Sequence, residues 1–181
     1  MSLLGVFPRR ILLLMIALRL VHVVLGVFWA GTLIFVATFL NPAVRAAGPE
    51  GGRVMLRLQE RGFMTVMPVV AALTILSGLA LYWRISGGLQ GVWVGSRMGI
   101  AFAAGGVASI VAFVIGVFVM RPAALRVAVL VAGLEQVAEG PARQARQAEI
   151  QALRLRNAAA TRWVAGLLGI AVVTMAVARY V

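Results

Sequence analysis

The sequence predicts an all-α integral membrane protein, built as an antiparallel bundle of four transmembrane helices with a helical extension between helices 3 and 4. The first observation is composition: hydrophobic residue types make up 62% of 181 residues, and the mean hydropathy is +1.02. The second is that the apolar residues form four runs long enough to cross a bilayer. The third is that these runs lack the alternation of barrel strands, whereas helices satisfy their own backbone in lipid.

We expect the four spans at about residues 20–40, 63–83, 98–120 and 163–178. The segments between them are too short for an independent soluble domain, so residues 1–181 are expected to form a single membrane domain. The third span carries Ala101, Gly105 and Ser109 at four-residue spacing, a pattern that allows close contact between helices in a membrane.

Two connections have helical signals of their own. Pro42, Pro49 and the glycines of the first connection predict a break near Asn41 and a second helix that begins near Gly52. The third connection continues an apolar helical period, stops at Gly140 and restarts at the following proline. We therefore expect a helical hairpin that projects from the membrane.

The net charge of +12 comes from arginines that flank the spans, which indicates membrane orientation and excludes nucleic acid as a partner. Eleven arginines fall on the side of the first and third connections, and six fall on the side of the termini. The richer side is expected to be cytoplasmic, which places both termini in the periplasm of a bacterial inner (cytoplasmic) membrane. The pair Arg9 and Arg10 favours the reverse orientation.

All five glutamates lie on the arginine-rich side, so the arginines at the other membrane level have no side-chain acid to pair with. Arg19, Arg97 and Arg179 lie at the ends of apolar spans, where a guanidinium is costly without an anion. Lipid phosphate reached by extended side chains is one source of that anion. A bound cofactor with carboxylates is the other.

The only histidine, His22, lies within the first span and shares a helical stripe with a cation, a glycine and an aromatic residue. These residues predict a site for haem b. His22 would be the axial ligand of the haem iron, Gly26 would leave room for the ring, and Trp29 would pack nearby. The propionates would be held by Arg19, Arg97 and Arg179.

The second axial ligand is open at this stage. Met175 lies one turn deeper than Arg179, at about the depth of His22, and its thioether is one candidate for the haem iron. An exogenous ligand or a second His22 from a homodimer are the others. Met175 as a packing residue, and His22 as a structural histidine bonded to a backbone carbonyl, are the alternatives to metal binding.

The first span, "LRLVHVVLGVFWAGTLIF", resembles the first helix of the superfamily that joins the copper-resistance protein D membrane domain and the HemJ-type protoporphyrinogen oxidase. The shared pattern is H-x6-W-x-G, met by His22, Trp29 and Gly31. The segment "LTILSGLALYW" with Gly78 is similar to that superfamily's second helix, and "WVGSRMGIAF" places Arg97 at the HemJ-type lysine. The last helix, "GIAVVTMAVARYV", is similar to the closing helix of such proteins. The resemblance implies a four-helix bundle, with haem b on the first-helix histidine in one branch and copper handling in the other.

We therefore expect a b-type haem protein of the membrane, like a cytochrome b, with an electron-transfer or redox role and a membrane-soluble partner such as a quinone. The alternatives are HemJ-like oxidation of a tetrapyrrole, and a non-redox copper-transport or structural membrane protein. The chain has no cysteine, which excludes thiolate metal sites and covalent c-type haem. One histidine and scattered methionines make copper the weaker metal, because Cu(I) prefers clustered soft ligands.

Overall fold

The computed structural model describes residues 9–134 and 136–181, and every secondary-structure element in these ranges is helical. Four stretches are long and apolar enough to cross a membrane: Arg9–Ala46, Phe63–Ile85, Arg97–Ala132 and Pro141–Tyr180. The prediction of an all-helical chain with four such helices is therefore confirmed. Each of the four contains one of the expected spans.

The four stretches and the connections between them consist of the following elements in chain order. They are α1 (Arg9–Phe35), the π-helix η2 (Val36–Leu40), α2 (Asn41–Ala46), α3 (Gly48–Glu60), α4 (Phe63–Ile85), α5 (Gly91–Val94), α6 (Arg97–Ile115), the π-helix η3 (Gly116–Met120), α7 (Arg121–Ala132), α8 (Pro141–Val177) and the 3₁₀ turn η4 (Ala178–Tyr180).

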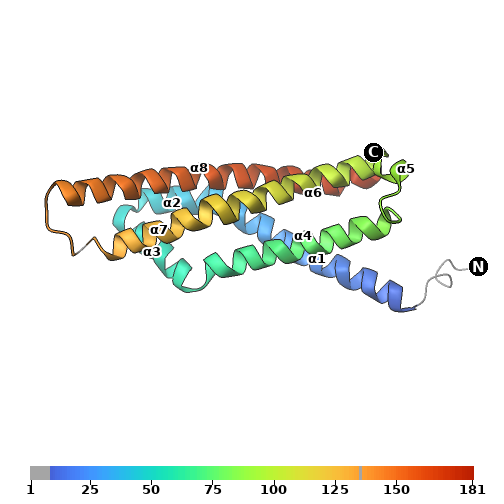
Figure 1. Cartoon of the computed structure of the whole chain (residues 1–181), viewed down its shortest axis with the longest axis horizontal. Helices are drawn as coiled ribbons and strands as arrows, with labels where there is room; N and C mark the ends of the chain where they lie inside the picture. The colour runs from blue at the N-terminus through green and yellow to red at the C-terminus, as the bar shows by residue number, and fades with distance from the viewer. Residues whose placement is uncertain (1–8, 135) are drawn as a thin grey trace, which may run out of the picture.

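The molecule is elongated, and its two ends are made of different elements (Figure 1). One end, called here the termini end, holds the start of α1, the short α5 and the C-terminus. The other, called here the hairpin end, holds α2, α3, α7 and the first half of α8. Between the ends, α6 packs most extensively against α8, and α1 against α4.

The first helix does not break at Asn41 as expected. It passes through the π-helix η2 and continues to Ala46, and the third span passes through η3 in the same way to Ala132. Each π-helix leads into an α-helix whose second residue is a proline, Pro42 in α2 and Pro122 in α7. A proline lacks the N–H of the helical ladder and its ring clashes with the carbonyl four residues back, so one wider turn absorbs the mismatch without ending the helix.

The second helix was expected to run from near Gly52 into the second span, and the structure divides it instead. Gly62 adopts φ +84°, a left-handed conformation that ends α3 and starts α4. Glycine has no Cβ and takes this conformation without steric cost. Helix α3 is therefore separate from the membrane-length α4, and it stays at the hairpin end (Figure 1).

The third connection is helical on both sides of a turn, which confirms the predicted hairpin of helices. Helix α7 ends at Ala132 and α8 begins at Pro141, after Gly140 with φ +148°. The two arms are joined by an ion pair between Arg126 and Glu149 at 3.0 Å. Arg146 also donates to the carbonyl oxygen of Gly133 at 3.0 Å.

The core lies where the four long helices meet, and it depends on small residues. Ala112 and Val164 are each 1% exposed, and they join Trp29 and Leu33 of α1 in one buried cluster. On α6 the buried residues are Gly99, Gly105, Ala108 and Ala112, whereas Ala101 and Ser109 of the expected set are partly buried. The buried set lets α8 approach closely, and Ser109 instead donates its hydroxyl to the carbonyl of Gly105.

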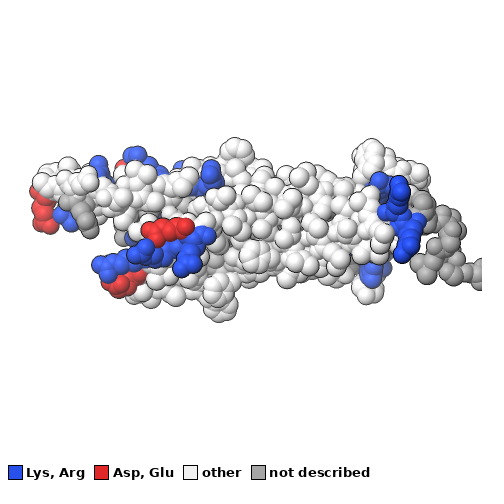
Figure 2. All heavy atoms as spheres, turned by 90° about the horizontal axis from the view of Figure 1, so that it is seen from below, with Lys and Arg blue, Asp and Glu red and all other residues white. Residues whose placement is uncertain are grey.

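Charged side chains gather at the two ends with an uncharged band between them, as the sequence predicted. Figure 2 shows arginines at both ends on the face that it views, and acids only at the hairpin end. All four ion pairs among the described residues lie at the hairpin end. The uncharged band is the part of the molecule that suits a bilayer.

The core makes one prediction about stability. Leu168 is 2% exposed, so Leu168→Ala leaves a cavity that the close-packed helices cannot fill. The free energy of unfolding should fall by about 2 to 5 kcal/mol, measured by denaturation of the detergent-solubilised protein. Ile170→Ala on the same helix is the control, because Ile170 is 55% exposed. Equal losses in both variants would contradict this core.

Candidate functional site

His22 lies between α1 and α4 and is held there by a hydrogen bond to the backbone of α4. Its Nδ1 is 2.8 Å from the carbonyl oxygen of Thr74. A carbonyl oxygen only accepts, so Nδ1 carries the proton and donates it. In the neutral ring, Nε2 then keeps its lone pair. This tautomer is the one in which Nε2 is available to a metal.

The carbonyl that receives this bond is itself part of a small polar group on α4. Ser77 donates its hydroxyl to the same Thr74 oxygen at 3.0 Å and to the Leu73 oxygen at 2.7 Å. Thr74 donates its own hydroxyl to the Val70 carbonyl at 2.8 Å. Thr74 and Ser77 are buried, so the acceptor of the His22 bond lies in a region of low water access. A hydrogen bond in such a place holds the ring more firmly than one exposed to water.

Gly78 has no side chain, and this leaves room for the imidazole of His22 against α4. A Cβ at position 78 would lie 2.7 Å from Cε1 of His22 and 3.0 Å from Nδ1, distances that real side chains do not adopt. Any side chain larger than hydrogen there would displace the ring. Gly26 makes a looser contact with the same helix, since its Cβ would lie 3.4 Å from the Thr74 methyl group. The space beside Gly26 in this interface is therefore used by α4, and its role toward a haem ring stays a prediction.

The half of α1 that carries His22 is poorly covered by the rest of the chain. The buried residues of α1 are Trp29, Ala30 and Leu33, all beyond the histidine. His22 itself is partly buried. Figure 1 shows α1 diverging from α8 toward the termini end, with α4 beside it. The surface around His22 is thus open to a flat ligand, a lipid or a second copy of the chain.

The arginines predicted to hold propionates are all exposed. Arg19 lies on α1, Arg97 begins α6, and Arg179 lies in η4 after α8. None of the three forms an ion pair with a carboxylate in the described part of the chain. The structure brings them to the termini end, the end without described acids in Figure 2. Their charges are available to an external anion.

Met175 lies in the contact between α6 and α8. Its Cγ and Cε would be 3.0 and 3.1 Å from a Cβ built on Gly105, so the thioether rests on that glycine. His22 instead contacts α4. The two predicted axial ligands therefore occupy different helix contacts, and Met175 as second ligand stays a prediction without a supporting contact.

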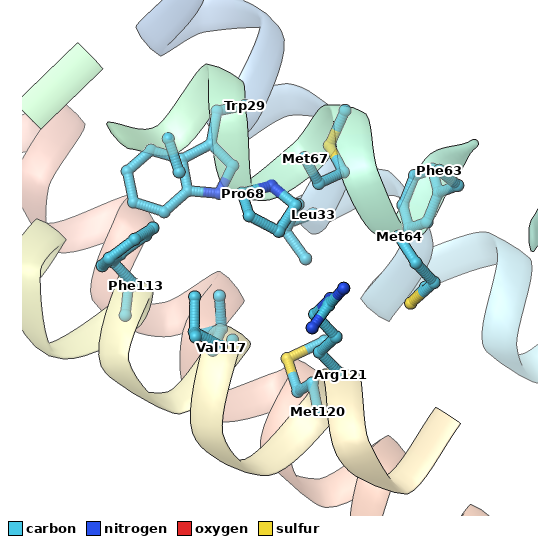
Figure 3. Close-up of a pocket in the computed structure, with 14 residues that line it drawn as sticks. Trp29, Leu33, Phe63, Met64, Met67, Pro68, Phe113, Val117, Met120 and Arg121 are labelled. Carbon is cyan, nitrogen blue, oxygen red and sulfur yellow. The ribbon is translucent and has the colours of Figure 1, made fainter. Parts of the chain in front are cut away.

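Trp29 packs in the core, and its predicted role beside a haem ring stays a prediction. It is 5% exposed and lines a cavity of about 60 Å³ among the four long helices. The same cavity is lined by three methionines, Met64, Met67 and Met120. Their proximity was not predicted from the sequence. Figure 3 shows the Arg121 side chain directed into it as well. A guanidinium beside the thioethers repels a metal cation, so this cluster does not favour copper.

The sequence pattern indicates His22 as a site residue but not the residues that contact it. Thr74, Ser77 and Gly78 fall on one face of α4 at helical spacing, as a small and polar stripe in an apolar span. That stripe was a signal for a close helix contact, because such residues gather at helix interfaces in membranes. In the sequence, Gly78 was noted only because the second span resembles the second helix of the superfamily named above.

Comparison with protein-family models, curated proteins and solved structures finds no match to this chain.

The His22 contact predicts that a single methyl group at position 78 disturbs the only histidine. Gly78→Ala should break the bond from Nδ1 to Thr74, because the added Cβ occupies the place of the ring. In haem-free protein labelled at histidine with ¹⁵N, the Nδ1 signal should lose its hydrogen-bonded shift. Gly106→Ala is the control, since a Cβ there meets nothing within 4 Å. An unchanged histidine spectrum in Gly78→Ala would show that the ring does not rest on α4.

Proposed function

We propose that the protein is an integral membrane haem protein of the b type, with its four long helices antiparallel across a bacterial inner membrane and its termini in the periplasm. In this proposal His22 is the axial ligand of haem b. The role is transfer of electrons to or from a membrane-soluble partner such as a quinone. Four helices of membrane length and the larger number of arginines at the hairpin end support this topology.

One observation carries the proposal: a histidine inside an apolar span donates Nδ1–H to a buried backbone carbonyl and so keeps Nε2 for a ligand. Metal-binding histidines commonly donate their other nitrogen in this way, which fixes the tautomer and raises the basicity of the ligating nitrogen. The donor set thus fits haem iron at one axial position. Arg19 and Arg179, which have no carboxylate partner among the described residues, fit the two carboxylates of the same group.

The chain's own residues have separable tasks in this site. Thr74 and Gly78 position the imidazole, and Arg19, Arg97 and Arg179 neutralise the propionate carboxylates. When bound, haem b supplies one-electron redox chemistry at its iron. Because Met175 lies against Gly105, a further ligand to the iron would come from a small exogenous molecule or from His22 of a second subunit in a two-fold dimer.

Two other functions are separated from this one by direct measurements. HemJ-like oxidation of a tetrapyrrole predicts turnover of a porphyrinogen by the haem-loaded protein. A structural or transport protein, whose arginines meet only lipid phosphate, predicts colourless protein from haem-replete cells. The oxidised and reduced absorption spectra of the purified protein therefore distinguish the leading proposal from the second alternative.

His22→Ala should abolish or greatly weaken haem b binding while the protein stays helical and inserted, because one ligand is removed from a lipid-facing helix. The Soret absorbance per protein and the far-ultraviolet circular dichroism give the two readouts. Gly78→Ala, which keeps the histidine but displaces it, should lower haem retention as well. Gly106→Ala should retain haem like the parent. Unchanged Soret intensity in His22→Ala would eliminate the proposal.

Charge at the termini end should tune the haem. Arg19→Gln and Arg179→Gln should each lower haem retention and the midpoint potential of the haem that is retained. Removing a cation leaves a carboxylate uncompensated, which favours the oxidised iron with its additional positive charge. Arg84→Gln is the matched control, since Arg84 lies at the end of α4, next to the turn. Potentiometric titration decides: identical potentials in all variants would make these arginines membrane anchors only.

A further inference from the structure

A second and much larger cavity lies at the hairpin end, remote from the described contacts of His22. Its volume is about 910 Å³, and it is formed by α2 and α3 on one side and by α7 and α8 on the other. Ligand pockets are commonly of roughly 300 to 1,000 Å³. The volume therefore suits a small organic molecule or part of a lipid.

The arm formed by α2 and α3 makes one wall, and its two helices pack closely. Gly51 is buried against the backbone of Val44, with no room for a Cβ between the two helices. Helix α3 carries two ion pairs, one from Arg53, which also lines the cavity, to Glu50 at 2.7 Å and another from Arg57 to Glu60 at 2.8 Å. The inward face contributes Met55 and Leu56 to the cavity.

The opposite wall combines hydrocarbon with a cation. Val127 and Val131 of α7 and Ile150 of α8 line it, so apolar surface is present on both sides of the cavity. Arg154 of α8 lines it as well, and its Nη2 would lie 3.3 Å from a Cβ built on Gly52. The guanidinium therefore reaches from α8 to the backbone of α3.

Two of the three arginines that line this cavity have no described carboxylate partner. Arg45 and Arg154 line it from different walls, and neither forms an ion pair with a carboxylate that the structure describes. No carboxylate belongs to the described lining. By contrast, Arg53 is compensated by Glu50. Two uncompensated guanidinium groups beside an apolar wall suit a ligand with an anionic head and a hydrocarbon tail.

A third polar group also lacks a partner. The side-chain oxygen of Asn157 is buried and has no hydrogen-bond partner among the described residues, and Asn157 lines this cavity. A buried acceptor without a donor costs free energy, and a hydroxyl of a ligand or a water would relieve that cost.

We propose that this cavity binds an anionic amphiphile, with Arg45 and Arg154 holding its phosphate or carboxylate and the apolar walls of α3 and α7 holding its hydrocarbon. The hairpin end is the arginine-rich end of the molecule, where the surface of a membrane supplies phosphate headgroups (Figure 2). Basic pockets between helices at that level are suited to anionic lipid headgroups. An anionic phospholipid and a soluble alkyl phosphate share this chemistry, and they are distinguished by the test.

The test uses the full-length protein in detergent, with binding measured by native mass spectrometry. The probes are phosphatidylglycerol, phosphatidylcholine of the same acyl chains, dodecyl phosphate and inorganic phosphate. We expect phosphatidylglycerol to bind roughly tenfold or more tightly than phosphatidylcholine, the ratio of one good charged contact. Binding of dodecyl phosphate without phosphatidylglycerol supports the proposal with a soluble ligand. Binding of neither overturns it, as does inorganic phosphate binding as tightly as dodecyl phosphate.

Variants separate this site from general attraction to a basic surface. The double change Arg45→Gln and Arg154→Gln should remove the preference for phosphatidylglycerol. The double change Arg57→Gln and Arg156→Gln removes the same charge from nearby exposed positions outside the lining, and it should keep the preference within about twofold. Equal losses in the two double variants would overturn the proposal.

A variant that keeps every charge tests the hydrocarbon wall. Val131→Phe fills part of the cavity from α7 and should weaken both phosphatidylglycerol and dodecyl phosphate roughly tenfold or more. Its circular dichroism should match that of the parent, since the added ring enters existing space. Full binding in a folded Val131→Phe protein would overturn the proposal.

Discussion

The close contact between helices is the constraint on which this structure depends. Lipid tails are as apolar as the side chains that face them, so helices associate in a membrane by close packing and by a few polar contacts. The chain supplies small residues where helices meet: Gly105 and Ala112 lie buried on α6, and Gly78 receives a side chain from α1. Larger side chains at these positions would force the helices apart while leaving each helix itself intact.

Close packing of helices also explains the position of the only histidine. His22 takes part in a contact between two helices and is at the same time a candidate ligand. Its bond to the Thr74 carbonyl satisfies one ring nitrogen inside an apolar contact, where an unsatisfied donor would be costly. Satisfying Nδ1 leaves Nε2 as the nitrogen without a described partner. A structural histidine and a ligating histidine thus share this hydrogen bond, and they differ only in what Nε2 meets. That difference can be measured by spectroscopy, because a haem bound through Nε2 would absorb visible light.

The two ends of the molecule differ in how their arginines are compensated. At the hairpin end, Arg53, Arg57, Arg126 and Arg143 lie within 4 Å of glutamates, while Arg45 and Arg154 line a cavity without a described acid. At the termini end, Arg19 and Arg179 have no described carboxylate partner. At both ends, therefore, exposed arginines lack a described carboxylate partner. Their surroundings differ, because an exposed helix face lies at one end and a cavity between helix pairs lies at the other.

The sequence by itself determined the helical class, the four membrane-length helices, the helical hairpin after the third span and the uneven placement of acids. These follow from local composition and periodicity, which act over a few turns of chain. The tertiary structure decided which faces meet. It carried two helices past Pro42 and Pro122 through π-helical turns, because a wider turn relieves the proline clash at less cost than ending a packed helix. It also places His22 against Gly78 and Met175 against Gly105, and it forms the cavity that Arg154 lines. Such contacts join residues far apart in the chain, and their geometry depends on how helices cross, which a one-dimensional pattern does not contain.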